Sequence, residues 1–344
     1  MAELPLKESP LRQLYSSSVK EWPAIQTSDQ RIVAELAPLP KLDNAPNKDL
    51  VALGERLFHD TLLSKDNSVS CASCHESRLA FADQRKLAIG INQQVGRRNT
   101  PTIVGMDLWQ SFFWDGRAKT AEQQALMPIT DPKEMNATIE GVLKRLRADK
   151  EYSTEFSSVF GSERDINPNT LSEAIVAFER TILPPHSQFM RFIELAYQAP
   201  SKAINLLNEQ QLEGLHLFRT KAKCMTCHHG PLFSDNQFHV TGFHFYQRKL
   251  HDVGRFEVTG KHQDSGAFRT PSLWAVSKTG PWFHNGVISS LRGIIRQYNA
   301  GGPRPKPKAH QIGDDNFPTT SNLLVKLQLT TEEQEALEAF LKML

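Results

Sequence analysis

The sequence predicts a mostly α-helical protein in which two similar halves follow one another. Three observations lead to this fold class. The run Cys71-Ala72-Ser73-Cys74-His75 returns as Cys224-Met225-Thr226-Cys227-His228, apolar residues recur at helical spacing before each run, and Ala199-Pro200-Ser201 interrupts the chain between them. A helix followed by the same short motif, twice in one chain, indicates an internal duplication at low similarity.

The two Cys-x-x-Cys-His runs contain all four cysteines. Two thiols spaced in this way can add to the vinyl groups of a haem, while the adjacent imidazole becomes the proximal ligand of the iron. A four-thiolate zinc site or a redox dithiol would also use Cys-x-x-Cys pairs, but neither requires the histidine that follows both times. We therefore expect two c-type cytochrome domains, each with one covalently attached haem, packed around an interdomain region. The haem-binding residues are Cys71, Cys74 and His75 in the first domain and Cys224, Cys227 and His228 in the second.

Composition and charge exclude some classes of function. The chain has 344 residues, enough for two or three domains with buried cores. A formal net charge of +2 argues against a nucleic-acid binder, whose basic excess would be larger and clustered. No apolar run approaches the roughly 18 residues of a membrane span. We therefore expect neither a nucleic-acid partner nor a membrane span.

The expected compartment is the bacterial periplasm, because thioether attachment of haem takes place outside the cytoplasm. The first residues, Met1-Ala2-Glu3-Leu4-Pro5, lack the basic region and the following apolar region of a leader peptide. We expect that such a leader has been removed or replaced.

Residues 1–46 show little periodicity and are predicted to form an N-terminal extension over the surface. A helix is expected to begin near Asn47, with Leu50, Leu53, Leu57 and Phe58 on one apolar face, and to lead into the first haem motif. This helix opens the first predicted domain, 47–200.

Beyond His75, a glycine-containing loop is expected to wrap a haem edge. The next predicted helix carries Gln124 and is closed by Met127-Pro128, and Pro132 opens the following element. Residues 137–197 are predicted to form several amphipathic helices, with a cap at Asn169-Thr170.

The second predicted domain, 201–344, repeats the plan. Asn208 and Gln211 make a capping-box-like start for a helix that runs into Cys224. A loop-rich stretch follows, in which 303–308 is predicted to be a basic, extended surface loop. Thr330 and Glu333 form the capping box of a final helix.

The chain resembles the bacterial dihaem cytochrome c peroxidase superfamily over roughly residues 47–344. The resemblance rests on signatures that occur here in the family's order. They are Leu53-Gly54-Glu55-Arg56-Leu57-Phe58, Arg98-Asn99-Thr100-Pro101-Thr102, Phe113-Trp114-Asp115-Gly116-Arg117, Pro132-Lys133-Glu134-Met135, Phe268-Arg269-Thr270-Pro271-Ser272-Leu273 and Trp282-Phe283-His284-Asn285-Gly286. By this resemblance the first domain is the peroxidatic one.

Two positions resemble the MauG-type branch of this family. Ile91 stands where other members carry a histidine that ligates the peroxidatic haem, and isoleucine cannot ligate iron. Tyr298 stands where they carry a methionine ligand of the second haem. A phenolate is a harder, anionic ligand than a thioether, so it favours oxidised iron and lowers the potential of the haem.

The resemblance also assigns roles around the first haem. Glu134 corresponds to the carboxylate that moves protons during peroxide cleavage, and Gln124 and Pro128 shape its pocket. Trp114 lies between the haems as an electron relay, and Arg117 pairs with a haem propionate. Without this context, Glu134 would be a solvated first-turn glutamate and Trp114 a core tryptophan.

Calcium is implied by resemblance alone. Asn99, through its side chain, and the backbone carbonyls of Thr279 and Pro281 match the family's ligand positions. Oxygen donors of this kind, completed by water, suit a hard cation.

The expected function is that of a MauG-like peroxidase-class oxidoreductase. Hydrogen peroxide would generate a high-valent dihaem state that oxidises a Trp or Tyr of a periplasmic partner protein. The alternative is a dihaem cytochrome c peroxidase that reduces peroxide with electrons from a small cytochrome or cupredoxin. A pure electron carrier is disfavoured because it has no use for Glu134 in an open pocket.

Overall fold

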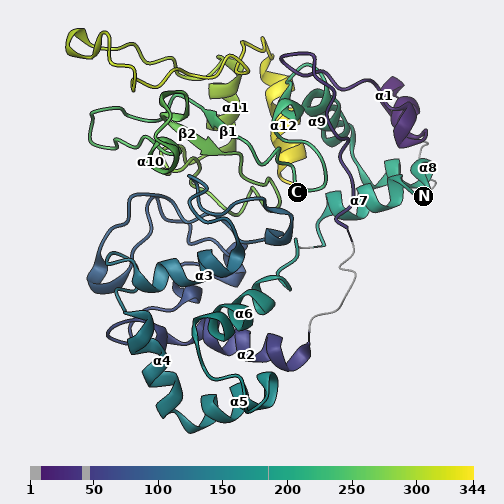
Figure 1. The fold of residues 1–344 in the computed structure, drawn as a ribbon. Helices are drawn as coiled ribbons and strands as arrows, with labels where there is room; N and C mark the ends of the chain where they lie inside the picture. The colour runs from purple at the N-terminus through teal and green to yellow at the C-terminus, as the bar shows by residue number, and fades with distance from the viewer. Residues whose placement is uncertain (1–8, 41–46, 185) are drawn as a thin grey trace.

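The computed structural model describes residues 9–40, 47–184 and 186–344. The predictions for residues 1–8 and 41–46, including the expectation about a leader peptide, lie outside these ranges. Within them the chain is mostly helical and has a single two-stranded sheet (Figure 1), so the predicted mostly-α class is confirmed. None of the helices in these ranges is both long enough and apolar enough to cross a membrane.

The helices are short and are joined by long loops. They are α1 (Pro10–Tyr15), α2 (Lys48–His59), α3 (Ala121–Thr130), α4 (Ile139–Ala148), α5 (Lys150–Phe160), α6 (Pro168–Glu179), α7 (Gln188–Ala196), α8 (Pro200–Ala203), α9 (Glu209–Arg219), α10 (Phe256–Thr259), α11 (Leu291–Asn299) and α12 (Thr331–Leu341). Strand β1 (Phe238–Val240) pairs antiparallel with β2 (Ala267–Arg269). The basic segment 303–308 has no helix or strand, and its Arg and Lys side chains are exposed, as predicted.

The helix before the first motif packs tightly on another helix of the same half. Helix α2 begins after Asn47, whose side chain accepts the N–H groups of Asp49 and Leu50, as expected. It lies against α6 so closely that a Cβ on Gly54 would be 1.9 Å from the carbonyl oxygen of Ala174. Only glycine permits this contact.

The second half repeats this arrangement. The predicted capping boxes of α9, formed by Asn208 and Gln211, and of α12, formed by Thr330 and Glu333, are both present. Helix α9 packs against α12, and a Cβ on Gly214 would lie 2.0 Å from the carbonyl oxygen of Ala336. Each half therefore contains a closely packed pair of helices, α2 with α6 and α9 with α12. In each pair a glycine lies at the point of closest approach.

Two local predictions are wrong. Helix α3 does not end at Met127-Pro128 but runs to Thr130 with Pro128 inside it, because a proline in the last turn removes only one helical hydrogen bond. The cap of α6 is Asn167 rather than Asn169-Thr170. Thr170 instead accepts the N–H of Asn167 at 3.0 Å, as the other member of a capping box.

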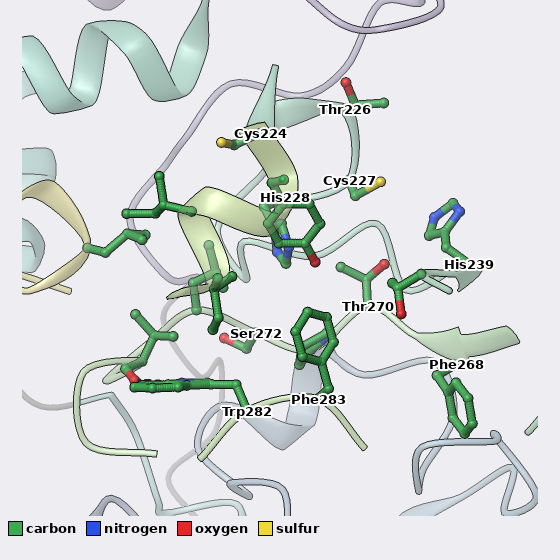
Figure 2. Close-up of a pocket in the computed structure, with 18 of the residues that line it drawn as sticks. Cys224, Thr226, Cys227, His228, His239, Phe268, Thr270, Ser272, Trp282 and Phe283 are labelled. Carbon is green, nitrogen blue, oxygen red and sulfur yellow. Dashed lines mark hydrogen bonds between the residues drawn. The ribbon is translucent and has the colours of Figure 1, made fainter. Parts of the chain in front are cut away.

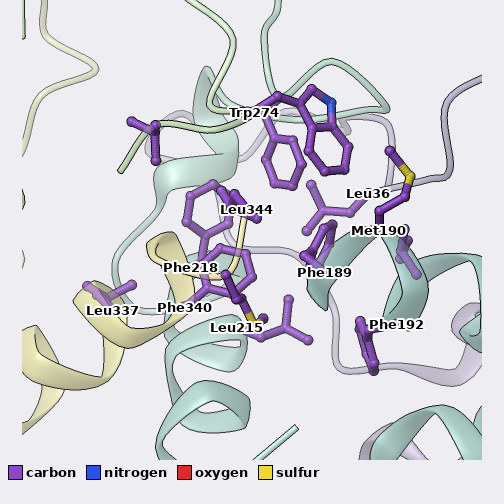
Figure 3. Packing of buried hydrophobic residues seen from close by; sticks show 14 of the residues in the cluster. Leu36, Phe189, Met190, Phe192, Leu215, Phe218, Trp274, Leu337, Phe340 and Leu344 are labelled. Atoms are coloured by element: carbon purple, nitrogen blue, oxygen red, sulfur yellow. The ribbon is translucent and has the colours of Figure 1, made fainter. Parts of the chain in front are cut away.

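The buried apolar residues form two clusters. The smaller one comes from residues 53–176 and includes Leu57, Leu146 and Leu171. The larger one gathers α7, α9 and α12 around aromatic rings such as Phe189 and Phe340 (Figure 3). Trp109 lies at the border and packs against both clusters.

The described part of the N-terminal segment belongs to the larger cluster. Tyr15 and Leu36 are fully buried, so this part of the predicted extension packs into the core of the second half and does not merely cover its surface. Glu35 forms an ion pair with the buried Arg219, whose Nη1 also donates to the Tyr15 hydroxyl at 3.0 Å. These contacts fix residues 9–40 to the second half.

A buried ion pair connects the two halves. Arg98, from the Arg-Asn-Thr-Pro-Thr signature, donates through Nε and Nη2 to the two carboxylate oxygens of Asp252, each at 2.8 Å. It also pairs with Asp115 of the Phe-Trp-Asp-Gly-Arg signature. The ion pairs hold both signatures against the second half of the chain. Other residues of these signatures, such as Asn99 and Trp114, line the cavity described below.

Candidate haem sites

The two Cys-x-x-Cys-His runs fold in the same way. Each begins with a 3₁₀ turn, Cys71–Ser73 and Cys224–Thr226. The N–H of the histidine then donates to the carbonyl of the first cysteine, at 2.9 Å in both runs. This turn places the two thiols and the imidazole of each run on one short stretch of backbone.

The histidine rings are held in the tautomer that an iron ligand needs. Nδ1 of His75 donates to the Phe81 carbonyl at 2.9 Å, and Nδ1 of His228 donates to the Phe233 carbonyl at 2.8 Å. Burial lowers the pKa of both imidazoles, which keeps the rings neutral. Each Nε2 is therefore left with a free lone pair, and the backbone fixes the orientation of each ring.

A cavity of about 220 Å³ extends from the second motif. Figure 2 shows Cys224, Cys227 and His228 on one side of it, with Ser272, Trp282 and Phe283 facing them. Helix α11 contributes a wall with helical spacing, made of Leu291, Ile294, Ile295 and Tyr298. Burial, followed by the neighbouring Cys227 and Cys224 thiols, raises the pKa of the Tyr298 phenol.

The residues of this cavity fit a covalently attached haem. Its walls are largely apolar, two free thiols lie at one edge, and an imidazole and a half-buried phenol line the same space. The four-thiolate zinc alternative fails. Among the described residues, which include all four cysteines, the only group of three or more His, Cys, Asp or Glu side chains close enough to bind one metal ion is Cys227, Asp235 and His239. The two Cys pairs therefore do not meet at one site.

Glu134 faces the first motif. It lies in the turn 132–135 after α3, and burial, with a smaller contribution from Asp131, raises its pKa to about 7 despite the opposing charge of Arg117. Burial is the main cause that raises the pKa of the Cys71 and Cys74 thiols, and the charge of Glu134 adds to it. A half-buried carboxyl of this pKa can take up and release a proton near neutral pH.

Ile91 packs against the segment that carries Glu134. Its side chain is 1% exposed and its N–H donates to the Glu134 carbonyl at 2.8 Å. The preceding Gly90 approaches the same turn so closely that a Cβ there would lie 2.1 Å from the Lys133 carbonyl oxygen. The loop therefore places the aliphatic side chain of Ile91 next to the turn that carries Glu134.

Gln124 and Pro128 are both half-buried on α3, one turn apart, so they share a face of the helix. The Pro128 carbonyl accepts the N–H of Met135 at 3.2 Å, which ties α3 to the turn that carries Glu134.

Arg117 stacks on the ring of Phe113 at 3.5 Å and donates to Asp115 at 3.2 Å.

Trp114 lies where the two halves meet, at the wall of the second-motif cavity. Its indole N–H donates to the Asn99 carbonyl at 2.9 Å, and its own carbonyl accepts the Arg269 N–H at 2.8 Å. The ring also approaches His284 edge-on, with centroids 6.5 Å apart. Contacts from both halves therefore fix this indole.

Similarity to known proteins decides the family. Cytochrome c551 peroxidase of Nitrosomonas europaea is 36% identical over 250 residues, which are 72% of this chain and 72% of that protein. The chain belongs to the dihaem cytochrome c peroxidase family. The family profile described as di-haem cytochrome c peroxidase matches residues 48–198.

Other members of the dihaem cytochrome c peroxidase family cover more of the chain. The methylamine utilization protein MauG of Methylorubrum extorquens is 34% identical over 315 residues, 90% of this chain and 82% of the relative. The crystal structure of a MauG-like protein associated with microbial copper homeostasis superposes with a TM-score of 0.75 at 30% identity, covering 91% and 94% of the two chains. The resemblance found in the sequence is thus confirmed. The protein is a haem peroxidase, an oxidoreductase whose family implies two c-type haems.

The calcium ligands of the dihaem peroxidase remain a prediction. Asn99 donates through Nδ2 to the Arg85 carbonyl at 2.7 Å, which leaves its side-chain oxygen for another partner. Asn99 and Thr279 line the same cavity, and Pro281 follows Thr279 after one residue. Neutral oxygens of this kind can bind a hard cation.

Sequence reasoning missed three polar groups of this dihaem peroxidase, of which Glu179 and Arg269 are buried and His239 is half-buried. His239 lines the cavity and pairs with Asp235 at 2.8 Å, while Glu179 and Arg269 are each 4% exposed and have side-chain atoms without a hydrogen-bond partner. Burial, followed by the charge of Glu122, raises the pKa of Glu179 to about 8. Arg269 stands inside a recognised signature, and a cation in an otherwise apolar strand is a signal that could have singled it out.

Proposed function

We propose that this enzyme uses hydrogen peroxide to oxidise an aromatic side chain, a Trp or a Tyr, of a partner protein in the periplasm. The observation that carries the proposal is Tyr298, a half-buried phenol that lines the cavity of Cys224, Cys227 and His228. Ile91, buried beside the turn of Glu134, supports it, because an aliphatic side chain at this position cannot ligate iron.

The reaction balances without a further reductant. The aromatic substrate loses two electrons and two protons, and hydrogen peroxide takes up both to give two waters. The two haems would supply the redox chemistry of peroxide and store its oxidising equivalents until the substrate is oxidised. In the proposed division into 47–200 and 201–344, each half would hold one haem, with His75 and His228 as proximal ligands.

Glu134 is the proton carrier in this proposal. Peroxide cleavage requires that a proton move from one peroxide oxygen to the other, which departs as water. A carboxyl with a pKa of about 7 can accept that proton and return it within one turnover. Gln124 and Pro128 would border the pocket, and Arg117 would bind a haem propionate through its planar guanidinium.

Trp114 would carry electrons between the two halves. Its indole lies at the wall of the second cavity, in the chain segment that immediately precedes Arg117. Calcium bound by Asn99, Thr279 and Pro281 would hold the surroundings of this indole, because Asn99 is its hydrogen-bond acceptor.

Tyr298 would determine what the second site does. As a phenolate ligand it stabilises oxidised iron, so the site stores oxidising equivalents better than it accepts electrons from a mild donor. Burial raises the pKa of the free phenol, so binding to iron has to displace the proton.

The decisive measurement is electron paramagnetic resonance of the ferric protein before and after one equivalent of peroxide. We expect one high-spin and one low-spin signal at rest, and the loss of both on peroxide addition. Two low-spin signals at rest would mean that a protein ligand blocks the first iron and would contradict the proposal.

Tyr298→Phe tests the ligand directly. The variant should lose the low-spin signal of the second haem, whereas Tyr246→Phe should keep it. Tyr246 is a matched control because its hydroxyl is bonded to Asp314 at 2.7 Å and it does not line the cavity. An unchanged low-spin signal in Tyr298→Phe would reject Tyr298 as the ligand.

A second candidate function is peroxide removal with electrons from a small cytochrome or cupredoxin. The 36% identity to cytochrome c551 peroxidase favours it. Steady-state turnover with peroxide and reduced cytochrome c separates the two functions, since sustained turnover is expected only for the second.

A further inference from the structure

Arg269 is a buried cation without a counter-ion. Its side chain belongs to β2 and is 4% exposed, and no carboxylate of the described chain lies within ion-pair distance of it. Nη1 has no hydrogen-bond partner, and Nε makes only a long contact of 3.5 Å to the Phe113 carbonyl. Burial lowers the pKa of its guanidinium to about 10, which reflects the cost of a desolvated charge.

A second unpartnered donor lies beside it. The Arg269 guanidinium stands 4.0 Å over the ring of Trp109, and the Trp109 indole N–H is also buried without a partner. Both residues line the cavity that contains His228 and Tyr298. Figure 2 shows Phe268 and Thr270, which flank Arg269 in the chain, at the wall of this cavity.

Two buried donors at one cavity wall, one of them charged, favour an anionic acceptor in that cavity. Arginine presents its N–H groups in a planar fork that matches a carboxylate, and an indole N–H can add a further hydrogen bond. The haem that this cavity fits carries two carboxylates of its own. The acceptor can therefore arrive with the cofactor.

We infer that Arg269 and Trp109 together bind a propionate carboxylate of the second haem. Arg269 would supply the charge and Trp109, from the other half of the chain, a hydrogen bond. The inference rests on the haem pair of the family and holds whichever substrate the enzyme oxidises. It also makes the second haem a bridge between the halves, since Trp109 packs against both hydrophobic clusters.

The test uses the haem-loaded protein and two readouts other than activity. Arg269→Met should lower the midpoint potential of the second haem, because a removed positive charge favours ferric iron. The potential should also become more dependent on pH around neutrality, because a carboxyl without its cation has a higher pKa. The propionate-bending band in the resonance Raman spectrum should shift. Arg269→Lys, which keeps the charge, should restore the potential in large part.

Arg255→Met is the matched control. Arg255 also stacks on an aromatic ring, that of Phe238 at 4.4 Å, but it donates to the backbone carbonyls of Asp115 and Gly116 and does not line the cavity. Its removal should leave the potential and the Raman band unchanged. If Arg269→Met fails to fold, Trp109→Phe removes the N–H donor, keeps a smaller aromatic ring beneath the guanidinium, and should still shift the propionate band.

Two outcomes overturn the inference. The first is an unchanged propionate band in Arg269→Met and in Trp109→Phe. The second is a midpoint potential of the wild-type second haem that varies with the concentration of added chloride or acetate, together with a propionate-bending band that is the same in Arg269→Met and the wild type. That result would mean that Arg269 binds a free anion instead of the haem.

Discussion

The indole N–H of Trp114 donates to the carbonyl oxygen of Asn99 at 2.9 Å. This bond joins two signatures of the family, because Asn99 follows Arg98 and Trp114 precedes Asp115, and Arg98 is itself paired with Asp115. The acceptor is a neutral carbonyl, so the indole ring keeps a fixed orientation without a charge at its N–H.

Replacement of Trp114 should separate the two halves electronically. In Trp114→Phe we expect the first haem still to react with peroxide, while oxidation of the aromatic substrate falls at least about tenfold. Rapid-mixing spectroscopy with one equivalent of peroxide would measure both steps. Trp22→Phe, a change in the remote N-terminal segment, should leave both rates intact. Equal substrate oxidation in the wild type and Trp114→Phe would exclude the relay.

Glu134 should make peroxide cleavage depend on pH. Because its pKa is raised to about 7, the carboxylate that accepts a proton is present above pH 7 and is lost as the pH falls below it. The rate of the peroxide reaction should therefore rise between pH 6 and pH 8, as measured by stopped-flow absorbance. Glu134→Gln should slow it by about 10²- to 10⁴-fold and remove this rise. The control is Glu140→Gln, at an exposed glutamate of α4, and a variant at Glu134 that kept the wild-type profile would exclude the role.

The pair of Arg98 and Asp252 should contribute strongly to stability. Arg98→Met leaves the buried carboxylates of Asp252 and Asp115 with only their longer contacts to Arg97 and Arg117, each at 3.2 Å, and should lower the free energy of unfolding by up to about 3–5 kcal/mol. Arg164→Met breaks a more exposed pair with Glu173 and should cost less than about 1 kcal/mol. Denaturant titrations of both variants measure this difference, and equal losses would show that burial of the first pair is immaterial.

The same pair should make the protein sensitive to acid. Although burial opposes it, the hydrogen bonds and charge of Arg98 lower the pKa of Asp252 to about 2. Its contribution to stability is therefore complete above the ordinary aspartate pKa and disappears as the pH falls toward 2. Asp252→Asn should remove this part of the acid-induced loss of stability.

The glycines of the two helix pairs should not tolerate a side chain. Gly54→Ala and Gly214→Ala would each force a methyl group onto a backbone carbonyl, at 1.9 and 2.0 Å, and should cost about 1–3 kcal/mol. In Gly141→Ala the added methyl would meet only the Thr138 hydroxyl, at 2.9 Å, so this helical variant should be neutral or stabilised by up to about 1 kcal/mol. The midpoints of thermal unfolding rank the stabilities of the three variants. Equal midpoints would show that the close helix contacts at Gly54 and Gly214 do not require glycine.

The sequence predicts best those features that depend on near neighbours. Caps such as Asn47, Asn208 and Thr330 bond within three residues, so their side chains alone indicate where a helix begins. The motif turns at Cys71 and Cys224 are local in the same sense.

Features that depend on distant partners could not be predicted in this way. Tyr15 and Leu36 lie in a segment without periodicity, and their burial depends on residues about 200 positions away, such as Arg219. Arg98 and Asp252 are 154 residues apart, and no local pattern pairs them. The donors at Arg269 and Trp109 meet only because the two halves pack together.

The two hydrophobic clusters also differ in when they can be completed. Every residue of the smaller cluster is available once residue 176 has been synthesised or exported. The larger cluster joins Tyr15 and Trp22 to Phe340 of α12, so it must wait for the last helix. Leu337 and Leu341 of α12 line the cavity next to the second Cys-x-x-Cys-His motif. The pocket of Cys224 and Cys227 therefore cannot be completed before α12 is available, and a chain that stopped before α12 would leave these thiols without two of the side chains that enclose the cavity.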